Sequence, residues 1–174
     1  MIPYGRQSID DADAAAVMEV LRSDWLTTGP KVAEFEAAFA AATGSGHAVT
    51  FANGTAALHA AMHAHGVGAG DEVIVAANTF VASANCVLYQ GGRPVFADVD
   101  EVAMLIDSAD VRRRITPRTR GIIAVDYAGQ PCDYDALNAI AAEHGLFLHA
   151  DACHALGAEF RGRKVGSLAG SSSF

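Results

Sequence analysis

The stretch Leu146-Phe147-Leu148-His149-Ala150-Asp151 is a short apolar run that ends on an aspartate. A similar run, Gly121-Ile122-Ile123-Ala124-Val125-Asp126-Tyr127, precedes it, and the spacing of apolar residues over Tyr134–His144 predicts a helix between the two. Strands that are apolar throughout are typical of a parallel sheet whose two faces are covered by helices. These runs therefore predict two parallel strands joined by a helical crossover.

The same alternation extends toward the N-terminus and predicts a doubly wound α/β domain, with a mainly parallel sheet and helices on both faces. Residues 1–30 are expected to form an N-terminal helix and loop, and residues 31–174 the main domain. A hairpin with Gly162 in its turn is predicted over 159–166, and the run Ser167–Phe174 carries no charge, cap or turn signal. The remaining predicted strands are 47–52, 72–76 and 94–98, and the remaining helices run from Ser8 or Asp10 to about Arg22, from Pro30 to Gly44, and over 55–65, 81–90 and 109–115.

Composition excludes several classes of protein. The 174 residues carry a net charge of −8, and 51% are hydrophobic against 18% charged, which is typical of a folded globular protein. A phosphate-backbone binder needs a positive field, so nucleic acid is not an expected partner. No apolar run approaches the roughly 20 residues that span a bilayer, and the first residues contain no signal-peptide h-region.

The cysteines indicate a reducing compartment. Cys86, Cys132 and Cys153 form no C-x-x-C pair and leave an odd count, so neither a disulfide framework nor a structural zinc site is expected. Together with the absence of a spanning or signal segment, this pattern predicts a cytoplasmic protein that does not bind to membranes.

The carboxyl ends of the predicted strands should meet at one edge of the sheet, where ligands of this fold bind. That edge is expected to carry Asn53-Gly54-Thr55, Asn78-Thr79-Phe80, Asp126-Tyr127 and Asp151. At the first of these turns, the amides of the first helical turn and a threonine hydroxyl would suit an anion. The same residues would also serve as a plain helix cap.

Phe80 and Asp151 each allow two interpretations. Phe80 offers a flat face to a planar ring but would also fit in the core. Asp151 ends an apolar strand, where a carboxylate is costly unless it meets a cation such as a protonated pyridine nitrogen, and it would alternatively cap a helix. A metal site at His149, Asp151 and His154 is less favoured, because a ligand beyond the strand end has no fixed direction, so no metal is expected.

Five segments carry a more specific pattern. They are Trp25-Leu26-Thr27-Thr28-Gly29-Pro30, Asn53-Gly54-Thr55-Ala56-Ala57-Leu58, Asn78-Thr79-Phe80-Val81-Ala82-Ser83-Ala84-Asn85, Pro94-Val95-Phe96-Ala97-Asp98-Val99 and Asp151-Ala152-Cys153-His154-Ala155-Leu156-Gly157-Ala158. Together they resemble the sugar-nucleotide aminotransferases of the DegT/DnrJ/EryC1/StrS family, and the resemblance covers essentially the whole chain.

The resemblance implies a transferase of fold type I that depends on pyridoxal 5′-phosphate, with residues 31–174 as its cofactor-binding large domain, incomplete at the C-terminal end. Asp151 would pair with the ring nitrogen and keep it protonated, so that the ring can accept negative charge when an amino group migrates. His154 would support the ring and Asp151. The phosphate would be held by Gly54, Thr55 and Ala56, and Phe80 would stack on the ring.

The resemblance also implies a substrate and an assembly. Tyr4, the loop Trp25-Leu26-Thr27 and Asn53 fall where the family approaches its substrate, which makes residues 1–30 the substrate side. The segment 125–129, with Asp126 where many relatives have His, and the tail 166–174 are similar to aminotransferases on the route to pseudaminic acid. Those enzymes convert a UDP-linked 4-keto-6-deoxy-N-acetylhexose to its 4-amino sugar, with glutamate as the amino donor expected here and a homodimer as the family's assembly. Relatives that make other amino sugars fit as well.

The chain departs from the family pattern at its end. Relatives continue after a residue like Phe174 with Ser-Phe-His and then the Schiff-base lysine, which this sequence does not include, so no catalytic residue is assigned within it. Lys31 and Lys164 are the only lysines, and neither matches the lysine motif. The chain alone is therefore expected to be inactive. Two alternatives remain: a sugar dehydratase of the same family, which has His at the lysine position, and a non-catalytic nucleotide-sugar-binding module.

Overall fold

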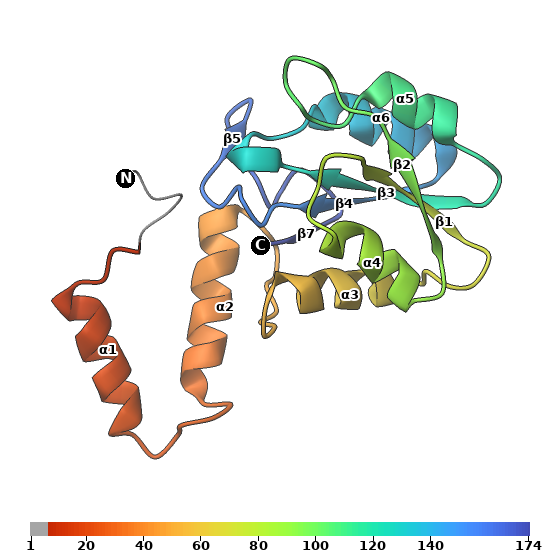
Figure 1. Ribbon diagram of the computed structural model, residues 1–174. Coiled ribbons are helices and arrows are strands. Elements are labelled where there is room, and N and C mark those ends of the chain that lie inside the picture. The colour runs from red at the N-terminus through yellow and green to blue at the C-terminus, as the bar shows by residue number, and fades with distance from the viewer. Residues whose placement is uncertain (1–6) are drawn as a thin grey trace, which may run out of the picture.

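The computed structural model of the protein describes residues 7–174 and is built around a five-stranded sheet (Figure 1). The strand order is β2-β1-β3-β4-β7, and every neighbouring pair is parallel. This arrangement confirms the predicted parallel α/β architecture. The strands are β1 (Glu72–Ala76), β2 (Arg93–Ala97), β3 (Thr119–Val125), β4 (Phe147–Asp151) and β7 (Ser171–Ser173).

Helices cover both faces of this sheet, as the sequence predicts (Figure 1). One face packs against α3 (Gly54–Ala64) and α4 (Ala82–Tyr89), and the other against α5 (Ser108–Arg114) and α6 (Tyr134–His144). The central strands are nearly free of solvent contact: all five residues of β1 and six of the seven residues of β3 are buried, whereas the edge strand β2 is partly exposed. Burying one side chain the size of valine or isoleucine stabilises a fold by roughly 1.5–3 kcal/mol, so these strands supply the core.

The helix boundaries follow local signals in the sequence. Helix α1 (Asp11–Leu21) begins at Asp10, whose side chain accepts hydrogen bonds from the amides of Ala12 and Asp13. Helix α2 (Pro30–Thr43) has proline in its first turn and ends before Gly44, which adopts a φ of 70°. Both helices match the predicted boundaries within a residue.

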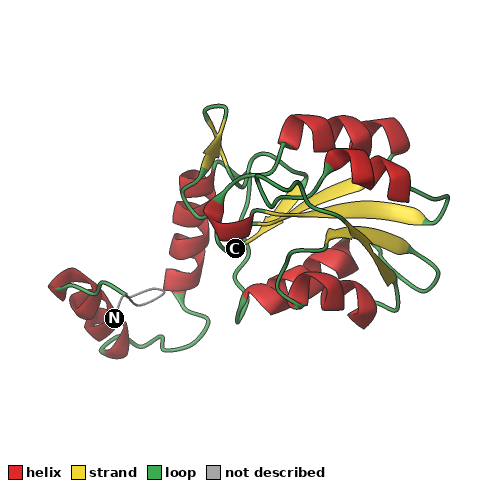
Figure 2. Ribbon diagram, turned by 45° about the horizontal axis from the view of Figure 1, so that its top comes forward, coloured by secondary structure: helices red, strands yellow, loops and turns green. Residues whose placement is uncertain are grey.

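The first two helices form an arm that extends away from the sheet (Figure 2). None of the residues of α1 is buried. In α2, Phe35 is 54% exposed. None of the helices in the described part of the chain is both long and apolar enough to cross a membrane.

One strand assignment from the sequence is wrong, and one strand was not predicted. The predicted strand 47–52 has no strand partner in the structure, and Val49 within it is 70% exposed. Conversely, Ser171–Ser173 forms β7 beside β4, with Ser171 opposite His149 and Ser173 opposite Asp151. A run of serines has low strand propensity, so the local sequence does not predict this strand, and its pairing with β4 defines it. The predicted hairpin is confirmed as β5 (Glu159–Phe160) and β6 (Arg163–Lys164), with Gly162 at a φ of 76° in its turn.

A buried carboxylate lies at the N-terminal end of β1. Glu72 is 1% exposed and accepts hydrogen bonds from Thr116 Oγ1, Arg118 Nη2 and Arg93 Nη2, each at 2.6 Å. The hydrogen bond from Thr116 and the two guanidinium groups lower the pKa of Glu72 to about 2. This cluster is satisfied within the chain and lies at the opposite end of the strands from the ligand-binding edge.

Candidate functional site

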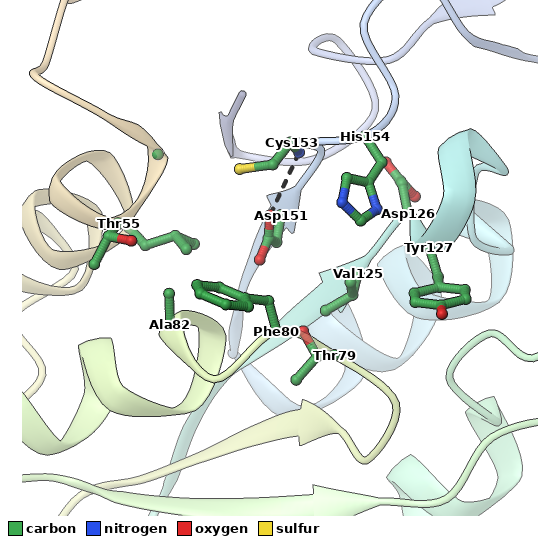
Figure 3. A pocket seen from close by; sticks show the side chains of 12 residues that line it. Thr55, Thr79, Phe80, Ala82, Val125, Asp126, Tyr127, Asp151, Cys153 and His154 are labelled. Atoms are coloured by element: carbon green, nitrogen blue, oxygen red, sulfur yellow. Dashed lines mark hydrogen bonds between the residues drawn. The ribbon is translucent and has the colours of Figure 1, made fainter. Parts of the chain in front are cut away.

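A cavity of about 210 Å³ opens at the carboxyl ends of the strands, as the fold predicts (Figure 3). Its walls come from the N-terminus of α3 and from the segments that follow β1, β3 and β4. The volume is below the roughly 300–1,000 Å³ of a typical ligand pocket, so it suits a small group or one part of a larger ligand. Five of the six predicted cofactor-binding residues line it: Gly54, Thr55, Phe80, Asp151 and His154.

Asp151 is the last residue of β4 and is 6% exposed. Its Oδ2 accepts a hydrogen bond from Ser83 Oγ at 2.5 Å, and its Oδ1 lies 3.4 Å from the Cys153 amide nitrogen. No helix begins after Asp151, so the helix-cap interpretation is wrong. Within residues 7–174 no cationic side chain pairs with this carboxylate, and a buried charge of this kind favours a positively charged ligand group.

Phe80 follows β1 and presents its ring to the cavity (Figure 3). The side chain is 68% exposed, so the interpretation of Phe80 as an ordinary core residue is wrong. An exposed aromatic face beside a buried carboxylate can stack on a flat ring whose edge carries a positive charge.

At the N-terminus of α3, one backbone amide is used in the helix cap and two others have no partner among the described residues. Asn53 is the N-cap: its Oδ1 accepts a hydrogen bond from the Ala56 amide at 2.9 Å. Ala56 does not line the cavity, so its predicted contact with an anion is not supported by the geometry. The amides of Gly54 and Thr55 have no protein partner among the described residues and remain available to an anion.

Gly54 is required by close packing at this helix start. A Cβ atom added there would lie 2.8 Å from Cys153 Sγ and 3.5 Å from the Phe174 carbonyl oxygen. Any larger residue would therefore have to displace the Cys153 side chain, which follows β4.

Replacing Asn53 with alanine is expected to lower the free energy of unfolding by about 1 kcal/mol, because the Ala56 amide loses its cap. Asn53→Ser is the matched control, since serine caps a helix almost as well. Urea unfolding of both variants measures the difference. Equal stability of the two variants would contradict the capping role.

The segment after β3 is held in place by a buried carboxylate. Asp126 is 1% exposed, and its two oxygens accept hydrogen bonds from the Cys132 amide at 2.9 Å and the Tyr134 hydroxyl at 2.8 Å. Burial raises the pKa of Asp126. Because both oxygens are engaged inside the chain, Asp126 fixes the segment that places Tyr127 at the cavity wall.

His154 contacts this segment. Its ring lies edge-on to the ring of Tyr127, with 6.2 Å between the centroids (Figure 3). No hydrogen bond joins His154 to Asp151 within the described residues. The Asp151 side chain accepts a hydrogen bond from the hydroxyl group of Ser83, a residue to which the sequence assigned no role.

The predicted substrate-side residues do not gather at this cavity. Trp25, Leu26 and Thr27 lie in the loop between α1 and α2, where Trp25 is 62% and Leu26 64% exposed. Tyr4 lies outside the described residues. Asn53 lines a second, open groove of about 980 Å³ between the segment 44–53 and β7.

Neither lysine lines the cavity. Lys31 pairs with Glu34 on α2 at 2.9 Å, and Lys164 lies on the β5–β6 hairpin. In the described part of the chain, no group of three His, Cys, Asp or Glu side chains is placed to hold a metal ion. The residues around the cavity can thus bind, stack and orient a ligand, but they offer no amine that could attack it.

Comparisons with known proteins agree with this geometry. Residues 7–174 match the model of the DegT/DnrJ/EryC1/StrS aminotransferase family. The spore coat polysaccharide biosynthesis protein SpsC of Bacillus subtilis (strain 168) is 43% identical over 173 residues, which are 99% of this chain and 44% of SpsC.

Solved structures give the same result. Helicobacter pylori PseC, an aminotransferase involved in the biosynthesis of pseudoaminic acid, is 34% identical with a TM-score of 0.92, over 99% of this chain and 47% of its own. The protein Spr1654 of Streptococcus pneumoniae in its PLP form is 33% identical with a TM-score of 0.93, over 97% of this chain and 47% of its own.

This chain thus spans less than half the length of these relatives. The match nevertheless covers all of its described residues and includes every segment that builds the cavity. The chain belongs to the DegT/DnrJ/EryC1/StrS aminotransferase family.

Proposed function

We propose that this chain is the cofactor-binding N-terminal part of an aminotransferase that depends on pyridoxal 5′-phosphate and acts on a nucleotide-linked sugar. The observation that carries the proposal is Asp151: a buried carboxylate that faces the cavity and has no cationic partner in the described chain. The family and the relatives' structures support the same assignment, because Spr1654 has been solved in a PLP form.

The donors and surfaces around the cavity fit the chemistry of this cofactor. The free amides of Gly54 and Thr55 at a helix N-terminus suit its phosphate, and the exposed face of Phe80 suits its ring. The carboxylate of Asp151 suits a protonated ring nitrogen. When bound, the cofactor supplies an electron sink for the negative charge that develops as an amino group migrates.

In this proposal, the residues at the site bind or position the ligands. Asp151 would hold the proton on the ring nitrogen, and His154 together with Tyr127 lines one side of the cavity. The loop Trp25-Leu26-Thr27 and Tyr4 belong to the substrate side, and we propose that they reach substrate in a homodimer. The large exposed side chains of the α1–α2 arm, such as Leu21, support such an assembly.

The substrate that fits best is a UDP-linked 4-keto-6-deoxy-N-acetylhexose, with glutamate as the amino donor. The segment 125–129 and its Asp126 support this choice, as does the similarity to PseC. SpsC, named for polysaccharide biosynthesis, supports a product used in surface polysaccharides. We further propose that the enzyme works in the cytoplasm and that the present chain does not transfer nitrogen alone, because neither Lys31 nor Lys164 lines the cavity.

The test follows the amino nitrogen in the whole enzyme that contains this chain. The enzyme is incubated with ¹⁵N-glutamate and the UDP-linked 4-keto sugar, and the sugar nucleotide is analysed by mass spectrometry. We expect a 4-amino sugar that carries ¹⁵N. A product that has lost water without gaining nitrogen would identify the dehydratase activity instead, and a protein that binds the nucleotide sugar unchanged would identify a binding module. Either result would contradict the proposal.

A further inference from the structure

We propose that Thr79 and Ser83 form a two-hydroxyl relay that positions Asp151 for a cationic ring nitrogen. The inference rests on the proposed function, since that function supplies the ligand, and it concerns residues to which neither the sequence nor the comparisons assign a role. The relay links the loop after β1 to the end of β4 through the first turn of α4.

The relay is short, and its inner hydroxyl group, that of Ser83, is closed to water. Ser83 is 0% exposed, and its Oγ lies 2.5 Å from Asp151 Oδ2. Thr79 Oγ1 lies 2.7 Å from the same Ser83 oxygen. Thr79 itself lines the cavity, so the relay begins at the ligand site and ends on the carboxylate below it.

Counting protons gives the relay a direction. A serine hydroxyl has one proton to donate, and an ionised carboxylate can only accept. Ser83 therefore donates to Asp151, since its other acceptor, the Phe80 carbonyl oxygen, is farther away at 3.2 Å. The proton between the two hydroxyl groups must then come from Thr79. Each donor polarises the next bond, which strengthens the final hydrogen bond to the charged group.

The consequence is that the carboxyl group of Asp151 is held in one rotation. Oδ2 is engaged by Ser83, while Oδ1 has only a long contact of 3.4 Å with the Cys153 amide. Oδ1 is thus the oxygen left to accept a proton donor from a ligand. A carboxylate that is fixed in one orientation binds a cationic N–H more tightly than one that is free to rotate.

The experiment measures binding of two probes to the 174-residue chain by calorimetry. One probe is pyridoxamine 5′-phosphate, which needs no lysine to bind, and the other is its carbocyclic analogue with C–H in place of the ring nitrogen. We expect Ser83→Ala to weaken binding of the first probe about 10-fold, a loss typical of one hydrogen bond to a charged group. Binding of the second probe should change less than about twofold, because it has no cation for Asp151 to hold.

Ser172→Ala is the matched control. Its Oγ is buried, like that of Ser83, but has no hydrogen-bond partner in the described residues, and it does not line this cavity. We expect it to leave the binding of both probes unchanged. Equal weakening of both probes by Ser83→Ala would indicate a merely structural role for Ser83 and would overturn the relay, as would no weakening of either.

A second measurement tests in the absence of a ligand whether the relay exists. In proton NMR spectra of the free chain, we expect a slowly exchanging hydroxyl proton that disappears in Ser83→Ala and moves upfield in Thr79→Val. Its absence, or an unchanged position in Thr79→Val, would overturn the relay even if the cofactor binds. If the unsubstituted chain binds neither probe while this hydroxyl signal is present, the proposed cofactor site fails and the hydroxyl relay stands as a structural feature.

Discussion

Asp151→Asn is expected to weaken binding of pyridoxamine 5′-phosphate to this chain about 100-fold. The carboxylate is 6% exposed and has no cationic partner in the described residues, so a cationic ring nitrogen would meet its charge directly. Hydrogen bonds to charged groups contribute about 1.5–3 kcal/mol, and 100-fold corresponds to about 2.7 kcal/mol. Asparagine keeps the shape of the side chain but removes the charge. Calorimetric titration of both proteins measures the effect.

The same substitution should not destabilise the free protein. Without a ligand, Asp151 is a buried charge held by Ser83 and by a long contact with the Cys153 amide, so removing the charge should leave the free energy of unfolding unchanged or raise it. Loss of stability in Asp151→Asn, together with equal loss of affinity for the carbocyclic analogue, would show that Asp151 serves the fold and not the ligand.

The sequence predicts the strands that are buried on both faces and the edge strand β2, but it fails for the segments 47–52 and Ser171–Ser173. Val73-Ile74-Val75 and Ile122-Ile123-Ala124-Val125 are apolar because helices cover them, and the structure has both as strands. The runs 47–52 and Ser171–Ser173 depend on a neighbour. The first has an apolar pattern but no strand beside it, and the second has no pattern but pairs with β4. Edge strands are decided by pairing, which local sequence does not encode.

The cavity was predictable where it depends on topology. The carboxyl ends of parallel strands must share an edge, so Phe80 and Asp151 come together although they lie far apart in the sequence. Gly54 joins them at the N-terminus of α3, although no strand precedes it among the described residues. Ser83 was not predictable in the same way. Its hydrogen bond to Asp151 depends on how the first turn of α4 is oriented relative to the end of β4. The only signal in the sequence is the four-residue spacing of Thr79 and Ser83, which indicates that the two hydroxyl groups lie on one side of that turn.

In the α1–α2 arm, the sequence motif predicts a role that the described chain alone does not explain. Trp25-Leu26-Thr27 carries part of the family motif, but its side chains lie in solvent between α1 and α2. Nothing in the described chain covers them, and exposed apolar groups in this number favour burial against another surface. Motif residues can therefore be assigned to a site only when the surfaces that meet there are known, and this agrees with the proposed homodimer.

Lowering the pH from 7 to 5 is expected to lower the free energy of unfolding through His149 by about 2 kcal/mol. The side chain is 0% exposed, and its nitrogens lie 2.8 Å from Ser171 Oγ and 3.0 Å from Ser173 Oγ, so it fastens β7 to β4. Burial lowers the pKa of His149 to about 3, and His65, which also hydrogen-bonds Ser171 Oγ, adds to the shift.

The sign follows from the two states of His149. Unfolded histidine has a pKa near 6.5, so between about 6.5 and 3 the unfolded chain binds a proton that the folded chain excludes. The stability is complete above pH 6.5 and falls as the pH drops below it. The lowered pKa of His65 acts in the same direction, whereas the raised pKa of Asp126 acts in the opposite one. The lowered pKa of Glu72 removes stability only below about pH 4.5.

A comparison with His149→Gln isolates the effect, because both proteins retain the other titrating groups. Urea unfolding at pH 7, 6 and 5 should show that the stability of the unsubstituted chain falls about 2 kcal/mol further than that of the variant. His144→Gln, at the surface end of α6, is the matched control and should keep the full dependence. If His149→Gln retained the pH dependence of stability while His65→Gln lost it, the acid-sensitive contact with β7 would belong to His65 and not to His149. Ser171 Oγ contacts both rings, so that outcome would move the acid-sensitive contact from β4 to the end of α3.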